Sequence, residues 1–238
     1  MLSLRKEVSI TEDLAEKLLE ELTCETVFTI PIFGGIPIAE SVVVTWIIMA
    51  ALTLLSICLV RNLKVENPGR KQQVLEMAVG GLYSFFDDLI GEEGRRYVPY
   101  LISVAIYIGV ANLIGLLGLK PPTKDLNTTA ALAIISIVLI EYAGFHRKGL
   151  KGFIKSFAEP VAIIAPINIL ELFIKPLSLC MRLFGNVLGA FVVMELIKLL
   201  VPAFLPIPFS MYFDIFDGLI QAYVFVFLTA LFIKEAVE

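Results

Sequence analysis

The chain has 238 residues, of which 58% are hydrophobic, and its mean hydropathy is +0.87. Soluble domains are about 45–50% apolar, so this composition predicts a polytopic membrane protein. The formal net charge of −4 says little about partners, three scattered cysteines argue against a disulfide framework, and a single histidine argues against a His-based metal site. With no phosphate loop or nucleophile motif either, we expect no metal, cofactor, nucleic-acid partner or active site of its own.

Residues 1–40 are expected to lie outside the membrane. Residues 9–12 read as a capping box that opens a short amphipathic helix. Residues 26–38 are β-branched and aromatic around Gly34 and Gly35, which predicts a small hairpin on the membrane surface. A disordered tail is the alternative.

The first span is predicted at 41–60, which carries no charge and is followed by Arg61. Pro68 and Gly69 then break the chain. Residues 70–90 place apolar side chains on one face and polar ones opposite, so we expect an interfacial or re-entrant amphipathic helix there.

The second span is predicted at 97–119 and contains Asn112, an amide that needs a partner in lipid. Residues 120–125 are expected to form an outer turn. The third span follows at 126–145.

Glu141 lies near the far end of the third span, about one turn from His146 and Arg147. We expect it to join a structural ion pair at the interface rather than to carry protons. Residues 148–159 are expected to form a basic loop.

Residues 160–201 form a predominantly apolar segment, and a continuous helix of that length, at ~1.5 Å per residue, would exceed the ~30 Å membrane core about twofold. Two spans or one steeply tilted helix would both fit. Pro166 marks a break, but no polar turn follows before Pro202, which favours one long tilted helix. A last span at 208–233 completes an all-α membrane domain, 41–238, of about five spans.

Arg182 stands in the middle of the long apolar segment. An arginine at mid-helix costs about 2.5–3.5 kcal/mol on insertion scales, so such a residue usually faces protein or water and belongs to an ion path. Ser178, Gly185 and Gly189 share its helical face, and small residues allow another helix to approach closely. The alternative is an arginine at a helix end that reaches the headgroups.

Basic residues indicate the topology. Two loops and the end of the last span are rich in them: Arg61, Lys64, Arg70, Lys71, Arg95, Arg96, Arg147, Lys148, Lys151, Lys155 and Lys234. The opposite loops offer Lys120, Lys124 and Lys198, and the tail Arg5, Lys6 and Lys17. The positive-inside rule therefore predicts an outer N-terminus and a cytoplasmic C-terminus.

The run Lys-Pro-Leu-Ser-Leu-x-x-Arg-Leu-Phe-Gly-Asn at 175–186 resembles the signature of subunit a of F-type ATP synthases, the ion-channel stator beside the rotating c-ring. Further stretches are similar to other motifs of that family: 40–46, 96–100, 112–116, 122–128 and 219–225. The first forty residues match it poorly.

The resemblance implies that Arg182 couples ion flow to a c-subunit carboxylate, with Gly185 and Gly189 on the face toward the c-ring and a tilted helix pair beside it. It implies two half-channels. Candidates for the outer one are Asn112, Asn186, Glu195, Asp214, Asp217 and Gln221. Candidates for the inner one are Asn168, Glu171, Lys175 and Ser178. The implied partners are the c-ring, the subunit b peripheral stalk, the remaining synthase subunits and membrane lipid.

Simpler explanations stay open for several of these residues. Glu171 and Lys175 are four apart and would pair on one helix, while Asp214 and Asp217 would lie near the outer headgroups. The chain also departs from some family members, which carry an acid where it has Phe191 and a histidine where it has Asp214. The outer path would then be rebuilt from Glu195 and Asp214.

Two other classes of function are weighed against this one. A secondary transporter binding an anion at Arg182 is expected to show paired half-repeats, and none is visible. A purely structural subunit leaves Arg182 and the acidic stripe unexplained. The N-terminus is too acidic for a transit peptide and lacks a signal-peptide design, which favours a bacterial plasma membrane. The ion, H⁺ or Na⁺, is left open.

Overall fold

The computed structural model describes residues 26–31, 36–61, 63–65, 67–156, 165–200 and 206–237. In this part of the chain, five helices are long and apolar enough to cross a membrane: Glu40–Val60, Glu92–Leu117, Leu126–Gly149, Ala165–Lys198 and Pro208–Val237. The predicted all-α polytopic fold is confirmed. The helix predicted after the capping box at 9–12 lies outside the described residues.

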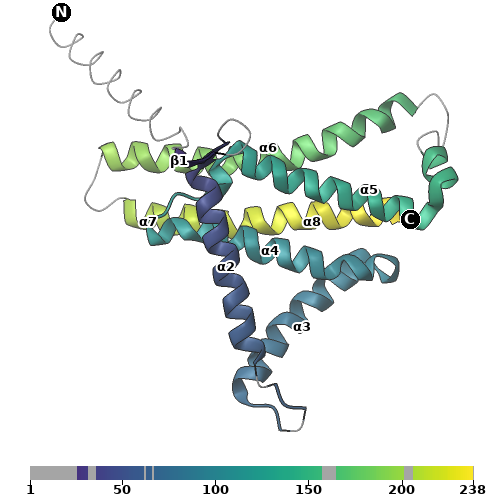
Figure 1. The fold of residues 1–238 in the computed structure, drawn as a ribbon, viewed down its shortest axis with the longest axis horizontal. Coiled ribbons are helices and arrows are strands. Elements are labelled where there is room, and N and C mark those ends of the chain that lie inside the picture. Colours follow the sequence, from purple (N-terminus) through teal and green to yellow (C-terminus); the bar gives the residue numbers. More distant parts are fainter. Residues whose placement is uncertain are drawn as a thin grey trace, which may run out of the picture.

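A two-stranded antiparallel hairpin precedes the helices. Strands β1 (Thr26–Ile30) and β2 (Ile36–Ala39) pair with Thr29 opposite Pro37. β-branched residues favour such extended backbone. The hairpin, rather than a disordered tail, therefore leads directly into the first long helix (Figure 1).

Helix α2 (Glu40–Val60) leans out of the bundle and is largely exposed (Figure 1). Its buried side chains, Ser41, Val44 and Ile48, lie in its N-terminal half. There Val44 and Ile48 pack with Ala111 and Ile114 in a small cluster of their own. The rest of α2 thus offers an apolar surface to lipid or to a partner.

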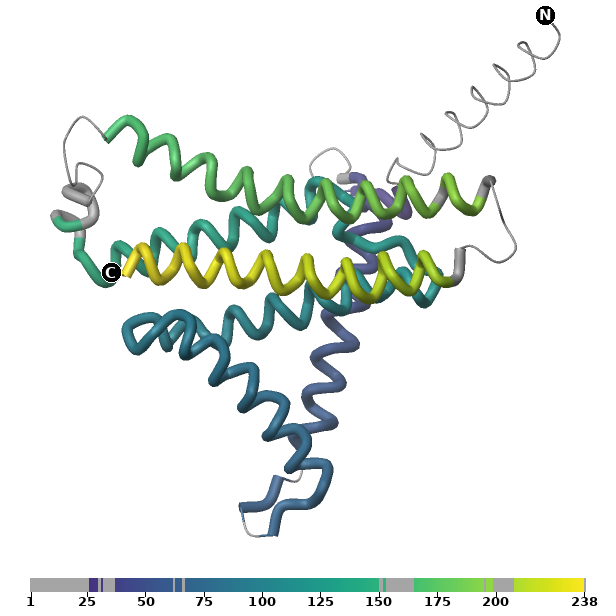
Figure 2. Tube along the Cα trace, turned by 180° about the vertical axis from the view of Figure 1, so that it is seen from behind, coloured from purple at the N-terminus to yellow at the C-terminus, as the bar shows by residue number. Residues whose placement is uncertain are grey.

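Helix α3 (Arg70–Ile90) is amphipathic and has the bounds that its pattern predicts. Gly91 ends it at φ 82°, a left-handed conformation that glycine adopts without strain, and its N–H donates to the Asp87 carbonyl over 2.8 Å. Phe86 and Ile90 bury this end in the main core, whereas the opposite end diverges from the bundle beside α2 (Figures 1 and 2).

Three helices form the centre of the bundle: α4 (Val98–Leu113), α5 (Leu126–Ser156) and α8 (Gly218–Val237). The main hydrophobic core lies between them and α6. Short 3₁₀ turns flank α4: η1 (Glu92–Tyr97) and η2 (Ile114–Leu117). The polar sites described below lie around the ends of these helices.

The expected basic loop at 148–159 is wrong for its first part, because α5 continues to Ser156. Gly149, at φ 69°, interrupts the helical backbone, so the helix turns there and resumes. Lysine is a good helix former, which explains why a basic stretch folds as helix after the break.

Helix α6 (Ala165–Leu200) is one helix of 36 residues, with Pro176 in its interior. It follows α5 over much of its length and moves away from α8 toward its N-terminal end (Figures 1 and 2). The last span begins with a short helix, α7 (Pro206–Ser210), and a π-helical segment, η5 (Met211–Asp217), that leads into α8.

Candidate functional site: a cavity and an exposed arginine face

The face of α6 that carries Arg182 is exposed, as are the neighbouring Ser178, Gly185 and Gly189. A Cβ atom on either glycine would meet nothing within 4 Å. The opposite face of the same helix is buried through Leu179, Leu183 and Val187, which pack into the main core. The 3.6-residue period of the helix therefore accounts both for the exposed face of α6 and for the face that is buried in the core.

A cavity of about 650 Å³ lies beside the C-terminal half of α6. Its walls come from the end of α4 and the turn after it, from α6, and from η5. Asn112, Asp214 and Asp217 all line it, together with Lys120 and Lys198. Three of the predicted outer residues are thus brought to one cavity, although one of them is about a hundred positions from the others in sequence.

Asn112 is buried and holds two segments together. Its Nδ2 donates to the Gly218 carbonyl over 2.8 Å, and Thr123 Oγ1 donates to its Oδ1 over 2.7 Å. A Cβ on Gly218 would stand 2.9 Å from the Asn112 Cβ, so only glycine permits this approach. The amide that the sequence left without a partner is therefore satisfied by the start of α8 and by the turn after α4.

Asp214 sits within the π-helical segment η5. Ser210 Oγ donates to its Oδ2 over 2.6 Å, and a Cβ on Gly115 would lie 3.2 Å from its Oδ1. π-Helical turns are rare in proteins and are frequently found at functional sites. Here the segment presents both Asp214 and Asp217 to the cavity.

The remaining predicted outer residues lie elsewhere. Gln221 is buried, and its Nε2 donates to Asp217 Oδ1 over 3.4 Å. It therefore contacts a residue that lines the cavity without lining the cavity itself. Asn186 lies on the exposed face of α6. Glu195 belongs to α6, but its side chain is outside the described part of the chain.

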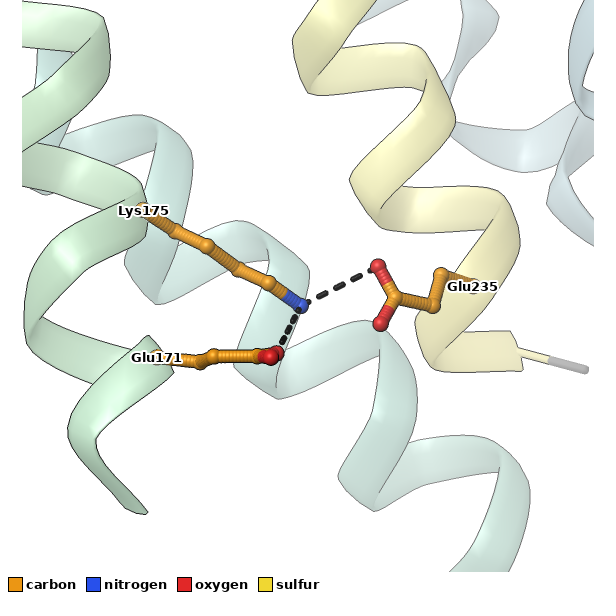
Figure 3. A network of polar contacts seen from close by, with 3 residues as sticks. All are labelled: Glu171, Lys175 and Glu235. Carbon is orange, nitrogen blue, oxygen red and sulfur yellow. Dashed lines mark hydrogen bonds and ion pairs between the residues drawn. The ribbon is translucent and has the colours of Figure 1, made fainter. Parts of the chain in front are cut away.

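The inner set is organised around Lys175 (Figure 3). Its Nζ lies 3.7 Å from Glu171 Oε2 on the same helix and 3.1 Å from Glu235 Oε2 on α8. The helical pairing of Glu171 and Lys175 is therefore present, but a third residue joins it. Glu235 was missed from sequence, because nothing in the pattern of α8 indicates which residue of α6 it meets. Asn168 is half-buried and Ser178 exposed on the same helix.

The expected partners of Glu141 are wrong. Arg147 instead pairs with Glu93, at the start of η1, and His146 stacks on Tyr142 with ring centroids 5.9 Å apart. Glu141 is half-buried, within electrostatic range of Lys175 and Glu235. Arg147 is therefore directed to η1, whereas His146 contacts a residue of α5 itself.

The predicted outer turn is not a solvated loop. Thr123, Lys124 and Asp125 are all buried, in and after the 3₁₀ turn η3 (Pro122–Lys124). Ser41 Oγ donates to Asp125 Oδ2, and the Lys124 Nζ stands 4.0 Å from the centre of the Phe191 ring. Since Phe191 lines the cavity, this turn forms part of the support of the site.

Comparison with known proteins identifies the family. The sequence model of the family described as ATP synthase A chain matches residues 42–234. A curated relative from Moorella thermoacetica, named ATP synthase subunit a, is 42% identical over 206 residues, which cover 86% of this chain and 94% of the relative. Another, ATP synthase subunit a 2 from Bradyrhizobium, is 40% identical over 205 residues, covering 86% of this chain and 91% of the relative.

The name of a third relative specifies an ion. The protein from Propionigenium modestum named ATP synthase subunit a, sodium ion specific, is 31% identical over 219 residues, covering 85% of this chain and 75% of the relative. Together with the five apolar helices, these matches establish a multi-pass membrane protein. The chain belongs to the ATP synthase A chain family.

Proposed function

We propose that this chain is the ion-translocating stator of an F-type ATP synthase, in which Arg182 and two half-channels couple ion flow to rotation of the c-ring. The observation that carries the proposal is the exposed arginine on a face of small residues. An arginine that faces water, or one that is buried for structural reasons, would not require small residues such as glycine around it. Family membership favours this function over a secondary transporter.

Arg182 separates the loading of an ion from its release. A positive charge favours the ionised form of a nearby carboxyl, so a carboxylate of a passing c-subunit is held ionised near the guanidinium. Away from the arginine, in lipid, the same carboxyl must be neutral because an unpaired charge there is too costly. The rotor can therefore pass Arg182 only after giving up its ion.

The outer half-channel is assigned to the cavity beside α6. Asp214 and Asp217 supply carboxylates that accept and release protons, and Asn112 adds an amide on the opposite wall. The exposed position of Asn186, one turn above Arg182, suits the last step toward the rotor. Glu195 is proposed for the same path from its place in sequence alone.

The inner half-channel is assigned to one stripe of α6. Asn168, Glu171, Lys175 and Ser178 follow one another at intervals of three or four residues, and Arg182 continues the series. Such spacing lays polar groups along one side of the helix. Ions entering from the inner end would thus be led toward Arg182.

The proposed partners are those that membership of the family suggests. The c-ring would lie against the Ser178–Gly189 face of α6, and the subunit b peripheral stalk and the remaining synthase subunits would bind elsewhere in a bacterial plasma membrane. Lipid would cover the other exposed apolar side chains. The proposed topology has the N-terminus outside and the C-terminus in the cytoplasm.

A labelling experiment tests this topology. Gln73 and Glu76 lie on the exposed part of α3, which we place along the cytoplasmic surface. Cysteine at either position should react with a membrane-impermeant reagent from the cytoplasmic side only. Reaction solely from outside would invert the topology.

Co-purification tests the function as a whole. The chain, extracted in mild detergent, should bring with it a ring of small hairpin subunits and ATPase activity. A transporter would purify without them and would bind an anion through Arg182. A purely structural subunit would bring the ring, and removal of Arg182 would then act through assembly rather than through coupling.

A further inference from the structure

We propose that Lys175 and Glu235 form a positioning pair, whose contact holds α6 against α8 and thereby sets where Arg182 stands. Glu235 has no part in the ion path described above, so this is a separate role for the end of α8. The inference rests on the proposed function, since the exact place of Arg182 matters only if a rotor passes it.

The contact crosses between two helices (Figure 3). Lys175 Nζ donates to Glu235 Oε2 over 3.1 Å, and the same ammonium lies 5.2 Å from the centre of the Phe232 ring, also on α8. The contact with Glu171, at 3.7 Å, runs along α6 itself and cannot tie the helices together. Among the described residues, the contacts of this ammonium with Glu235 and Phe232 therefore both link α6 to α8.

The contact lies beside a proline in the interior of α6. Pro176 follows Lys175 directly, has no N–H to donate to the Leu172 carbonyl, and weakens the helix at this turn. On the N-terminal side of this region α6 moves away from α8 (Figures 1 and 2). A side chain that reaches α8 at this point limits how far the weakened turn can swing.

Arg182 lies seven residues beyond Lys175, about two turns or ~10.5 Å along the helix axis and on the same face. A change in bend at Pro176 alters the direction in which this face points. The Glu235 side chain is 59% exposed, so the ion pair contributes modestly to stability. It can therefore favour one bend of α6 over another of similar free energy, but it contributes little to the stability of the fold.

Distances between spin labels test the contact directly, in the assembled complex with its three native cysteines replaced. Labels at Phe173 on α6 and Leu231 on α8 should report one main distance. Lys175→Met and Glu235→Gln should raise a longer-distance population by about 1.5- to fivefold, whereas Lys175→Arg should not. Glu171→Gln is the matched control for distance, because it removes only the contact within α6.

Ion-driven ATP synthesis tests whether the pair affects the function of Arg182. Glu235→Gln should lower ion-driven ATP synthesis by about 1.5- to fivefold with normal subunit content, and Lys234→Gln, a charge change at the adjacent position, should not. An unchanged distance between the spin labels in Glu235→Gln would show that the pair does not hold α6 against α8. A changed distance with normal ATP synthesis would show that the pair does not position Arg182. Failure of the proposed function would show instead as loss of the ring on purification.

Discussion

Replacing Arg182 with alanine should abolish ion-driven ATP synthesis while the complex still assembles. The guanidinium lies on the exposed face of α6, and the buried face packs through other residues, so its removal should not unfold the helix. Without it, nothing forces the rotor carboxyl to ionise between the half-channels. We expect a loss of two orders of magnitude or more, about the cost of removing a fixed charge stabiliser from an active site.

The same variant should leak. Moving one charge across 100 mV releases about 2.3 kcal/mol, so ions that cross without rotation drain the gradient without work. Arg182→Lys should also fail to couple, because a desolvated lysine can lose its proton. The measurement is ATP synthesis and dye-reported pumping in vesicles, with subunit content checked by blot. Normal pumping in Arg182→Ala would refute the role proposed for it, and loss of the whole complex would support a structural role.

Replacing Asp214 with asparagine should reduce ion-driven synthesis by roughly tenfold. A positioned acid–base group contributes about 10²–10⁴-fold to proton transfer, but Asp217 lines the same cavity and should sustain part of the flow. Asparagine can still accept the hydrogen bond from Ser210 Oγ, so the π-helical segment should keep its shape. The loss is therefore attributed to proton exchange rather than to folding.

The assay for Asp214 is the initial rate of pumping in vesicles at matched subunit content. Asp214→Glu should recover much of the rate because it restores a titratable carboxyl. Asp88→Asn, which removes an acid from the exposed side of α3, serves as the control and should pump at the parental rate. Equal rates for Asp214→Asn and the parent would remove Asp214 from the outer path.

Much of this protein follows from patterns within single helices. The amphipathic period of residues 70–90 predicts α3 with both of its bounds, and the lack of a polar turn predicts one long helix where α6 is found. The spacing around Arg182 predicts the face that is exposed. These features depend on apolar length and on the 3.6-residue period, which any stretch of chain carries by itself.

Other features were decided by packing between helices. Asn112 and Gly218 are 106 positions apart, and Lys175 and Glu235 are 60 apart, yet each pair is in hydrogen-bond contact. Arg147 pairs with Glu93 rather than with the nearby Glu141. Helical periodicity states which face a side chain occupies but not which helix that face meets. That choice depends on the crossing of α4, α6 and α8, so the cavity and its partners appear only in the tertiary structure.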